Sequence, residues 1–105
     1  MTAKELLMDL PNRVSKEAIE GANTLFHFDL EGEGGGQVTL GVENGEAFAK
    51  EGLDGDPKCV VKSKADNLLK VLKGDLNPMM AVLTGKLKIS NQGEMLKYAK
   101  IFGLM

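Results

Sequence analysis

Two residues could take part in acid–base or nucleophilic chemistry, because the chain contains one histidine, His27, and one cysteine, Cys59. A general base or an activated thiolate would need a partner within hydrogen-bonding reach. His27 alternates with the apolar residues of a predicted strand, so we expect it on the exposed polar face. Cys59 begins another predicted strand, and we expect it to be a small buried hydrophobe. One His and one Cys also exclude the common zinc spacings.

Carboxylates and glycines give no stronger indication of catalysis or of a cofactor. Asp54 and Asp56 lie in a glycine-containing loop, 52–57, but the Asp/Asn series and distal Glu of a calcium loop are missing. We expect them to be solvated turn residues. The run Gly32–Gly36 is followed by a strand pattern and not by the helix of a dinucleotide-binding motif. The sequence therefore predicts no enzyme, no metal site and no cofactor.

The bulk composition predicts one ordinary domain spanning residues 1–105. The 105 residues are 43% hydrophobic and 27% charged, with a formal net charge of −2, and a chain of this size can bury a hydrophobic core. No basic run is present, so we expect no nucleic-acid partner. The first ten residues lack the apolar stretch of a signal peptide, and no apolar run is long enough to span a bilayer. We expect a cytoplasmic protein.

The N-terminal half contains signals for helices, then for a strand meander. Thr2 and Glu5 have the spacing of a capping box, which predicts a helix up to Leu10. Ser15 is a candidate cap for a short helix over 16–20. Alternating apolar residues predict strands at 25–30, 38–43 and 46–51. Asn44-Gly45 between the last two is typical of a type I′ hairpin turn.

The C-terminal half predicts two more strands and three helices. A strand is expected at 58–63, and Ser63 with Asp66 three residues later predicts a capped helix over 67–73. Asn77-Pro78 is an N-cap followed by proline at the first helical position, which predicts a helix over 79–84. A strand at 86–90 and a helix at 93–104 complete the chain. The pattern indicates the α+β class: a five-stranded, mostly antiparallel sheet with short helices on its one covered face.

The last two helices carry more apolar residues than one buried face needs. Large apolar residues occupy four of the five positions over 79–83, and in the last helix Lys97 and Lys100 are the strongly polar interior positions. An amphipathic helix needs about three or four apolar residues per two turns. Such a helix must bury two sides, line a cavity or meet a partner.

The order of several motifs resembles the sterol carrier protein 2, or nonspecific lipid-transfer, family. These are Phe26–Gly32, the Asn44-Gly45 turn, Leu72-Lys-Gly-Asp-Leu-Asn-Pro-Met-Met-Ala81 and Thr84-Gly-Lys-Leu-Lys-Ile89. The resemblance spans about residues 5 to 102. It implies a sheet with helices on one face that enclose a hydrophobic cavity, and a carrier of fatty acids, fatty acyl-CoA or similar chains, possibly sterols. Some members carry glutamine where this chain has Met79, which makes a sterol hydroxyl contact less expected here.

The resemblance also implies which side chains contact the ligand. The apolar residues of the first two strands, the 79–83 helix and the C-terminal elements would line the cavity: Phe26, Phe28, Val38, Leu40, Met79, Met80, Leu83, Ile89, Leu96, Ile101 and Phe102. The alternative is a non-catalytic interaction or dimerisation module that uses the apolar C-terminal helix. A monomer or a homodimer, and transient membrane contact, are both compatible with a carrier.

An empty cavity of lipid size is unfavourable in so small a domain. A void of roughly 300 Å³ costs roughly 7 kcal/mol, a large part of the stability of a small protein. We therefore expect the protein either to retain lipid or to collapse its C-terminal helix into the cavity.

Overall fold

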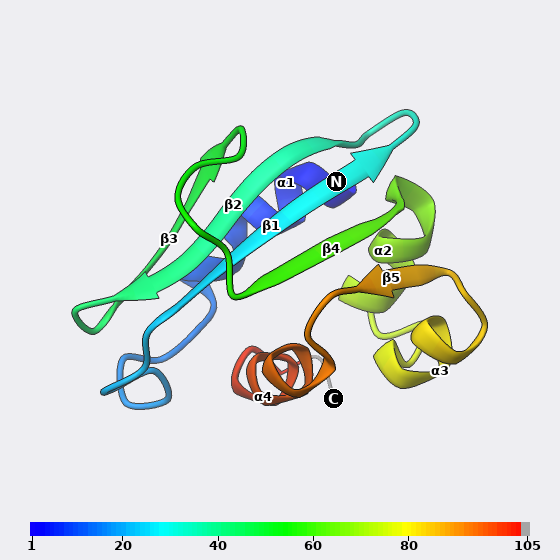
Figure 1. Ribbon diagram of the computed structural model, residues 1–105. Coiled ribbons are helices and arrows are strands. Elements are labelled where there is room, and N and C mark those ends of the chain that lie inside the picture. The colour runs from blue at the N-terminus through cyan, green and yellow to red at the C-terminus, as the bar shows by residue number, and fades with distance from the viewer. Residues whose placement is uncertain (104–105) are drawn as a thin grey trace.

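A five-stranded mixed sheet, with its helices on one face, forms the framework of the protein in the computed structural model, which describes residues 1–103 (Figure 1). The strand order is β3-β2-β1-β4-β5, where β1 and β4 are parallel and the other three pairs are antiparallel. The strands are β1 Thr24–Glu31, β2 Gly36–Glu43, β3 Glu46–Glu51, β4 Cys59–Lys64 and β5 Leu87–Ile89. The predicted α+β class and mostly antiparallel sheet are confirmed.

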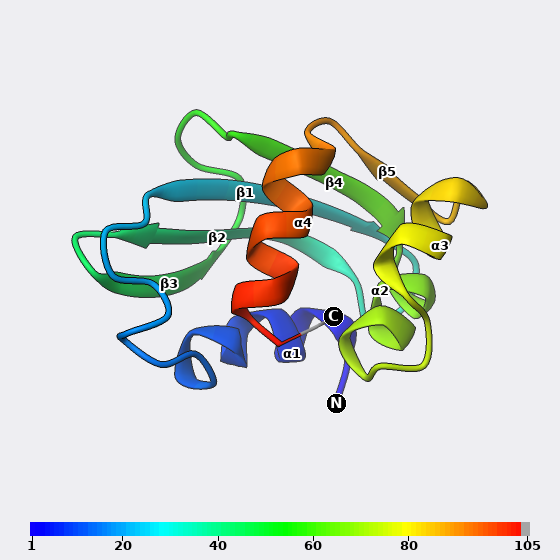
Figure 2. The same ribbon diagram turned by 90° about the horizontal axis from the view of Figure 1, so that it is seen from below.

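The helices are short and cover one face of the sheet, the face that Figure 2 shows from below. They are α1 Ala3–Asp9, the 3-10 helix η1 Leu10–Asn12, α2 Ala65–Leu72, α3 Pro78–Leu83 and α4 Gln92–Ile101. In Figure 2, α4 crosses the sheet, α1 lies beside its C-terminal end, and α2 and α3 lie together to one side. Leu104 and Met105, which the sequence included in or near the last helix, lie outside the described residues. In the part described, no helix has the length and apolar character needed to cross a membrane.

Several local signals give the expected structure. Thr2 and Glu5 form a complete capping box at α1. Asn44 and Gly45 have φ values of 53° and 77°, the positive values that a type I′ turn requires. The Asn77 side chain accepts hydrogen bonds from the backbone N–H groups of Met79 and Met80, so α3 begins where the Asn-Pro pair indicates.

Two predicted helix starts are wrong. Residues 16–20 form turns and not a helix, although the Ser15 hydroxyl accepts a hydrogen bond from the Ala18 N–H. Five residues before a glycine are too few to repay the cost of nucleating a helix. The second helix begins at Ala65 with Lys64 as its cap and no capping side chain. Ser63 stays in β4, and its hydroxyl donates to the Lys64 carbonyl.

The expectation that His27 is exposed is also wrong, because the face of the sheet opposite the helices is partly covered. To reach β4 from β3, segment 52–58 crosses this face over β2 and β1 (Figure 1). His27 is only 9% exposed beneath it, with Nε2 2.8 Å from the Asp54 carbonyl oxygen. Thr39 is fully buried; its hydroxyl donates to the Gly52 carbonyl and accepts from the Asp54 N–H. Strand alternation alone does not indicate such a cover.

Replacing Thr39 by valine is expected to lower the free energy of unfolding by about 1 to 3 kcal/mol. The change keeps the shape of the side chain but leaves the Gly52 carbonyl and the Asp54 N–H without their partner, and a buried unpaired polar group costs this much. Urea unfolding measures the difference. Thr39→Ser is the control, since it keeps the hydroxyl and loses one methyl group, worth about 0.8 kcal/mol. If Thr39→Ser lowers the free energy of unfolding more than Thr39→Val does, packing and not hydrogen bonding holds segment 52–58 on the sheet.

Candidate functional site

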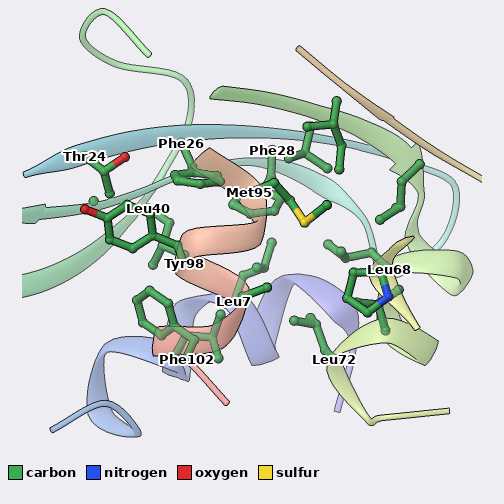
Figure 3. Close-up of a pocket in the computed structure, with 18 of the residues that line it drawn as sticks. Leu7, Thr24, Phe26, Phe28, Leu40, Leu68, Leu72, Met95, Tyr98 and Phe102 are labelled. Atoms are coloured by element: carbon green, nitrogen blue, oxygen red, sulfur yellow. The ribbon is translucent and has the colours of Figure 1, made fainter. Parts of the chain in front are cut away.

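An apolar pocket lies between the covered face of the sheet and the helices. Its cavity volume is about 60 Å³. Side chains of β1, β2, β4 and β5 form its roof, and α1, η1, α2 and α4 close it from below (Figure 3). Pro78 of α3 also belongs to the lining. Nearly all the side-chain atoms that Figure 3 draws are carbon. Chemically, the pocket excludes water and offers dispersion contacts to an apolar chain.

The structure brings five of the eleven predicted ligand-binding residues to this pocket and leaves six elsewhere. Those that line it are Phe26, Phe28, Leu40, Ile89 and Phe102. Those that do not are Val38, Met79, Met80, Leu83, Leu96 and Ile101. Val38 is fully buried in the core outside the pocket. Which of the eleven contact a ligand stays a prediction.

The outward orientation of Met80 and Leu83 explains why these two residues of α3 do not line the pocket. Pro78 and Ala81 are the buried residues of this six-residue helix. Met80 and Leu83 point away from the core and are 52% and 74% exposed. The apolar excess of α3 therefore lies on the protein surface.

Sequence reasoning missed the part of the pocket that the first two helices supply. Leu7 of α1 and Leu68, Val71 and Leu72 of α2 line it. The spacing of the α2 residues at i, i+3 and i+4 is a signal for one helix face. The same spacing is typical of ordinary core residues, so it does not distinguish a pocket from a core.

Helix α4 covers the pocket and is held to the rest of the protein mainly at its N-terminal end. Asn91, its cap, donates from Nδ2 to the Lys58 carbonyl, and its own carbonyl accepts from the Cys59 thiol. Glu94 accepts a 2.7 Å hydrogen bond from the Thr24 hydroxyl. Among the described residues, these are the hydrogen bonds between α4 and other elements. Apolar contacts of Met95, Ala99 and Phe102 hold the rest of α4 against the core.

One polar group of α4 lies in the pocket without a hydrogen bond. The Tyr98 ring packs edge-on against Phe26, with ring centroids 5.7 Å apart, and its hydroxyl is buried and unpaired. Burial raises the pKa of Tyr98, and the negative charge of Glu94 raises it further. The hydroxyl therefore stays protonated and is a hydrogen-bond donor.

The cavity is much smaller than a ligand pocket, which typically measures about 300 to 1,000 Å³. A void of this size costs only about 1.4 kcal/mol on the core-cavity scale. The pocket as it stands is therefore too small for a lipid chain, and α4 covers it. A lipid chain would have to displace α4 or its side chains to enter.

The residues first considered for catalysis do not meet. Phe26 and Cys59 are paired across β1 and β4, so Cys59 faces the helices, whereas His27 faces the opposite side. Cys59 is fully buried, as expected, and burial raises the pKa of its thiol. Asp54 is an exposed loop residue whose pKa is lowered by a hydrogen bond from Lys50. Within residues 1–103, no cluster of His, Cys, Asp and Glu has the arrangement of a metal site.

The sequence and fold both match known proteins. Residues 3–105 match the model of the SCP-2 sterol transfer family. Hydroxysteroid dehydrogenase-like protein 2 of Xenopus tropicalis is 32% identical over 104 residues, which are 97% of this chain and 25% of the relative. The chain thus spans about a quarter of the length of the curated relatives it matches.

Solved structures of sterol carrier proteins have the same fold. The solution structure of palmitated SCP2L2 from Aedes aegypti superimposes with a TM-score of 0.72 at 17% identity, covering 97% of this chain and 95% of that one. The apo form of sterol carrier protein 2 from Yarrowia lipolytica gives a TM-score of 0.65 at 22% identity, covering 96% and 84%.

Proposed function

This chain belongs to the SCP-2 sterol transfer family, and we propose that it uses the pocket beneath α4 to bind and carry a lipid. The ligand we propose is a fatty acid, a fatty acyl-CoA or a similar apolar chain, with a sterol as a further candidate. Family and fold support lipid binding or transfer. The observation that carries the proposal is the pocket itself, whose lining is almost wholly apolar.

Burial of the chain supplies the free energy of binding. Each buried methylene contributes about 0.8 kcal/mol, so twelve give roughly 10 kcal/mol before costs. Lost freedom and the displacement of α4 remove several kcal/mol. The remaining 6 to 8 kcal/mol, roughly, corresponds to micromolar affinity.

The hydrogen bonds of α4 indicate how the pocket opens. Asn91 and Glu94 hold its first turns, whereas apolar contacts hold Ala99 and Phe102. A lipid chain can replace those apolar contacts with its own, so the last turn of α4, after Tyr98, moves while the preceding turns stay in place.

We favour a carrier over a catalyst and over an interaction module. His27 and Cys59 lie on opposite faces of the sheet, and neither lines the pocket. The apolar residues of α4, within the described part of the chain, are buried or half-buried against the core, so they offer little surface to a partner. Size-exclusion mass at several concentrations distinguishes a monomer from a homodimer, and the cytoplasmic location stays a prediction.

Native mass spectrometry of the protein as purified tests the proposed function. We expect a population with added mass, and organic extraction to release an acyl lipid or a related apolar molecule. A clean ligand-free mass, together with no binding of fatty acids or acyl-CoA, contradicts the proposal.

We also propose a transient contact with an anionic membrane through lysines of β4 and β5 on the sheet face opposite the helices. Lys62 and Lys88 are directly opposite each other across β4 and β5, an arrangement that costs stability, and Lys64 and Lys86 line the same surface depression. Glu31 is the acidic residue among those that line this depression. A basic patch of this kind fits a negatively charged bilayer surface.

Replacing Lys88 by glutamine is expected to weaken binding to vesicles of anionic phospholipid about fivefold, because one lysine near such a surface contributes about 1 kcal/mol. Vesicle flotation at low salt measures the bound fraction. Lys16→Gln is the matched control, since Lys16 is exposed in the 16–20 turns, far from this patch in sequence. If the two variants lose vesicle binding equally, the attraction between protein and membrane depends only on the total charge of the protein.

A further inference from the structure

The hydroxyl of Tyr98 is buried and forms no hydrogen bond of normal geometry, although the Thr24 side chain lies near enough to lower the pKa of the phenol, which burial raises. Tyr98 is 3% exposed, lines the pocket and makes no hydrogen bond through its hydroxyl. A buried hydroxyl without a partner is costly and rare in folded proteins. A phenylalanine would fill the same space without the free-energy cost of an unpaired hydroxyl. The hydroxyl therefore indicates a hydrogen-bond acceptor supplied by a ligand.

Two further polar side chains lie close to this hydroxyl. Thr24 also lines the pocket, and its hydroxyl donates a 2.7 Å hydrogen bond to Glu94 Oε2. Because its hydrogen is used in that bond, the Thr24 oxygen is left with lone pairs that can accept. Glu94 lies behind Thr24 and outside the pocket lining, and its negative charge adds to burial, the larger cause, in raising the pKa of Tyr98.

We propose that Tyr98, Thr24 and Glu94 form a polar subsite that binds an uncharged hydroxyl at the end of the lipid chain. Among the apolar chains proposed above, the subsite then favours a long-chain alcohol over a fatty acid. This assignment rests on the proposed function, since it concerns the head group of the molecule that the pocket holds.

An alcohol satisfies the subsite in both directions. Its oxygen accepts the hydrogen of the Tyr98 hydroxyl, and its own hydrogen is donated to the Thr24 oxygen or to Glu94. A carboxylate also accepts from Tyr98, but it has no hydrogen to donate and its charge is repelled by Glu94 in a site of low polarity. A halogenated alkane fills the pocket but forms neither of these two hydrogen bonds strongly.

The subsite lies at one end of the pocket. In Figure 3 the oxygen atoms of Thr24 and Tyr98 are at one side, and Leu68 and Leu72 are at the other. Glu94 belongs to the first turns of α4, which hydrogen bonds hold in place. The head group thus occupies the fixed end of α4, and the chain extends toward α2.

Displacement of the neutral fluorescent probe N-phenyl-1-naphthylamine at pH 8 tests the assignment with three ligands: 1-decanol, decanoate and 1-fluorodecane. We expect the wild type to bind 1-decanol about tenfold more tightly than either of the others, as one buried hydrogen bond is worth about that much. The Tyr98→Phe variant should bind 1-decanol about tenfold more weakly than the wild type and bind 1-fluorodecane with unchanged affinity. The Glu94→Gln variant should bind decanoate more tightly than the wild type.

Thermal unfolding of the ligand-free variants shows that the changes are local. Tyr98→Phe should unfold at the same temperature as the wild type or higher, because it removes an unpaired hydroxyl. If the three ligands bind the wild type equally, or if Tyr98→Phe leaves the ratio of 1-decanol to 1-fluorodecane affinity unchanged, the subsite is refuted and the carrier function stands. If none of the three binds, the proposed function fails and the subsite fails with it.

Discussion

Replacing Phe26 by alanine is expected to destabilise the ligand-free protein by about 3 to 5 kcal/mol. Phe26 is 5% exposed and packs between two aromatic rings, 6.0 Å from Phe28 and 5.7 Å from Tyr98 between centroids. Its removal enlarges a void that the closed protein already contains. Since 1 kcal/mol shifts the melting temperature of a domain of about this size by roughly 4 to 8 °C, thermal unfolding should show a decrease of at least about 12 °C.

The same variant is expected to gain more stability from an apolar ligand than the wild type does. Phe26 lines the pocket, so a bound chain can fill the space that its ring leaves. Thermal unfolding with and without a saturating medium-chain lipid measures this gain.

Val38→Ala is the matched control, because Val38 is fully buried but does not line the pocket. It removes two methyl groups, worth about 1.6 kcal/mol, and should leave the gain from ligand at the wild-type value. If Phe26→Ala and Val38→Ala gain equally from the ligand, the chain does not bind beside Phe26.

A saturating apolar chain is expected to raise the melting temperature of the wild type by about 10 °C or more. A ligand that binds only the folded state stabilises it by about 2.7 kcal/mol at one hundred times its dissociation constant, which converts to such a shift for a small domain. The chain also replaces the small void with dispersion contacts. Differential scanning calorimetry over a range of ligand concentrations measures the shift.

Ala99→Leu separates pocket binding from general surface adsorption. Ala99 lies on α4, is 6% exposed and lines the pocket, so a leucine there extends into the cavity. We expect most of the ligand-induced shift to disappear in this variant, whereas the ligand-free protein keeps its melting temperature within a few degrees. An undiminished shift would show that the chain binds elsewhere.

Local chemistry explains which parts of this fold the sequence predicts. The Asn44-Gly45 turn and the Asn77 cap follow from interactions among neighbouring residues. The apolar alternation of β1 and β2 places Phe26, Phe28 and Leu40 toward the pocket, because successive side chains of a strand point to opposite faces.

The features of the fold that the sequence does not predict depend on contacts between segments that are distant in the chain. The parallel pairing of β1 with β4 and the burial of His27 both require segment 52–58 to cross the sheet, and no local pattern specifies that path. An apolar surplus in α3 indicated either a cavity or a surface, and only the tertiary packing places Leu83 outside. The sequence does not single out Tyr98, because an unpaired hydroxyl is recognisable only when its surroundings are known.

The most direct test of lipid binding in this pocket is the observation of intermolecular nuclear Overhauser effects between a protonated 1-decanol chain and the protein, deuterated except at selected methyl and aromatic groups. We expect cross-peaks from the chain to Leu7, Phe26 and Met95, which line the pocket beneath α4. Cross-peaks confined to the exposed Met80 and Leu83 on α3 would place the lipid on the surface and contradict a carrier with an internal site.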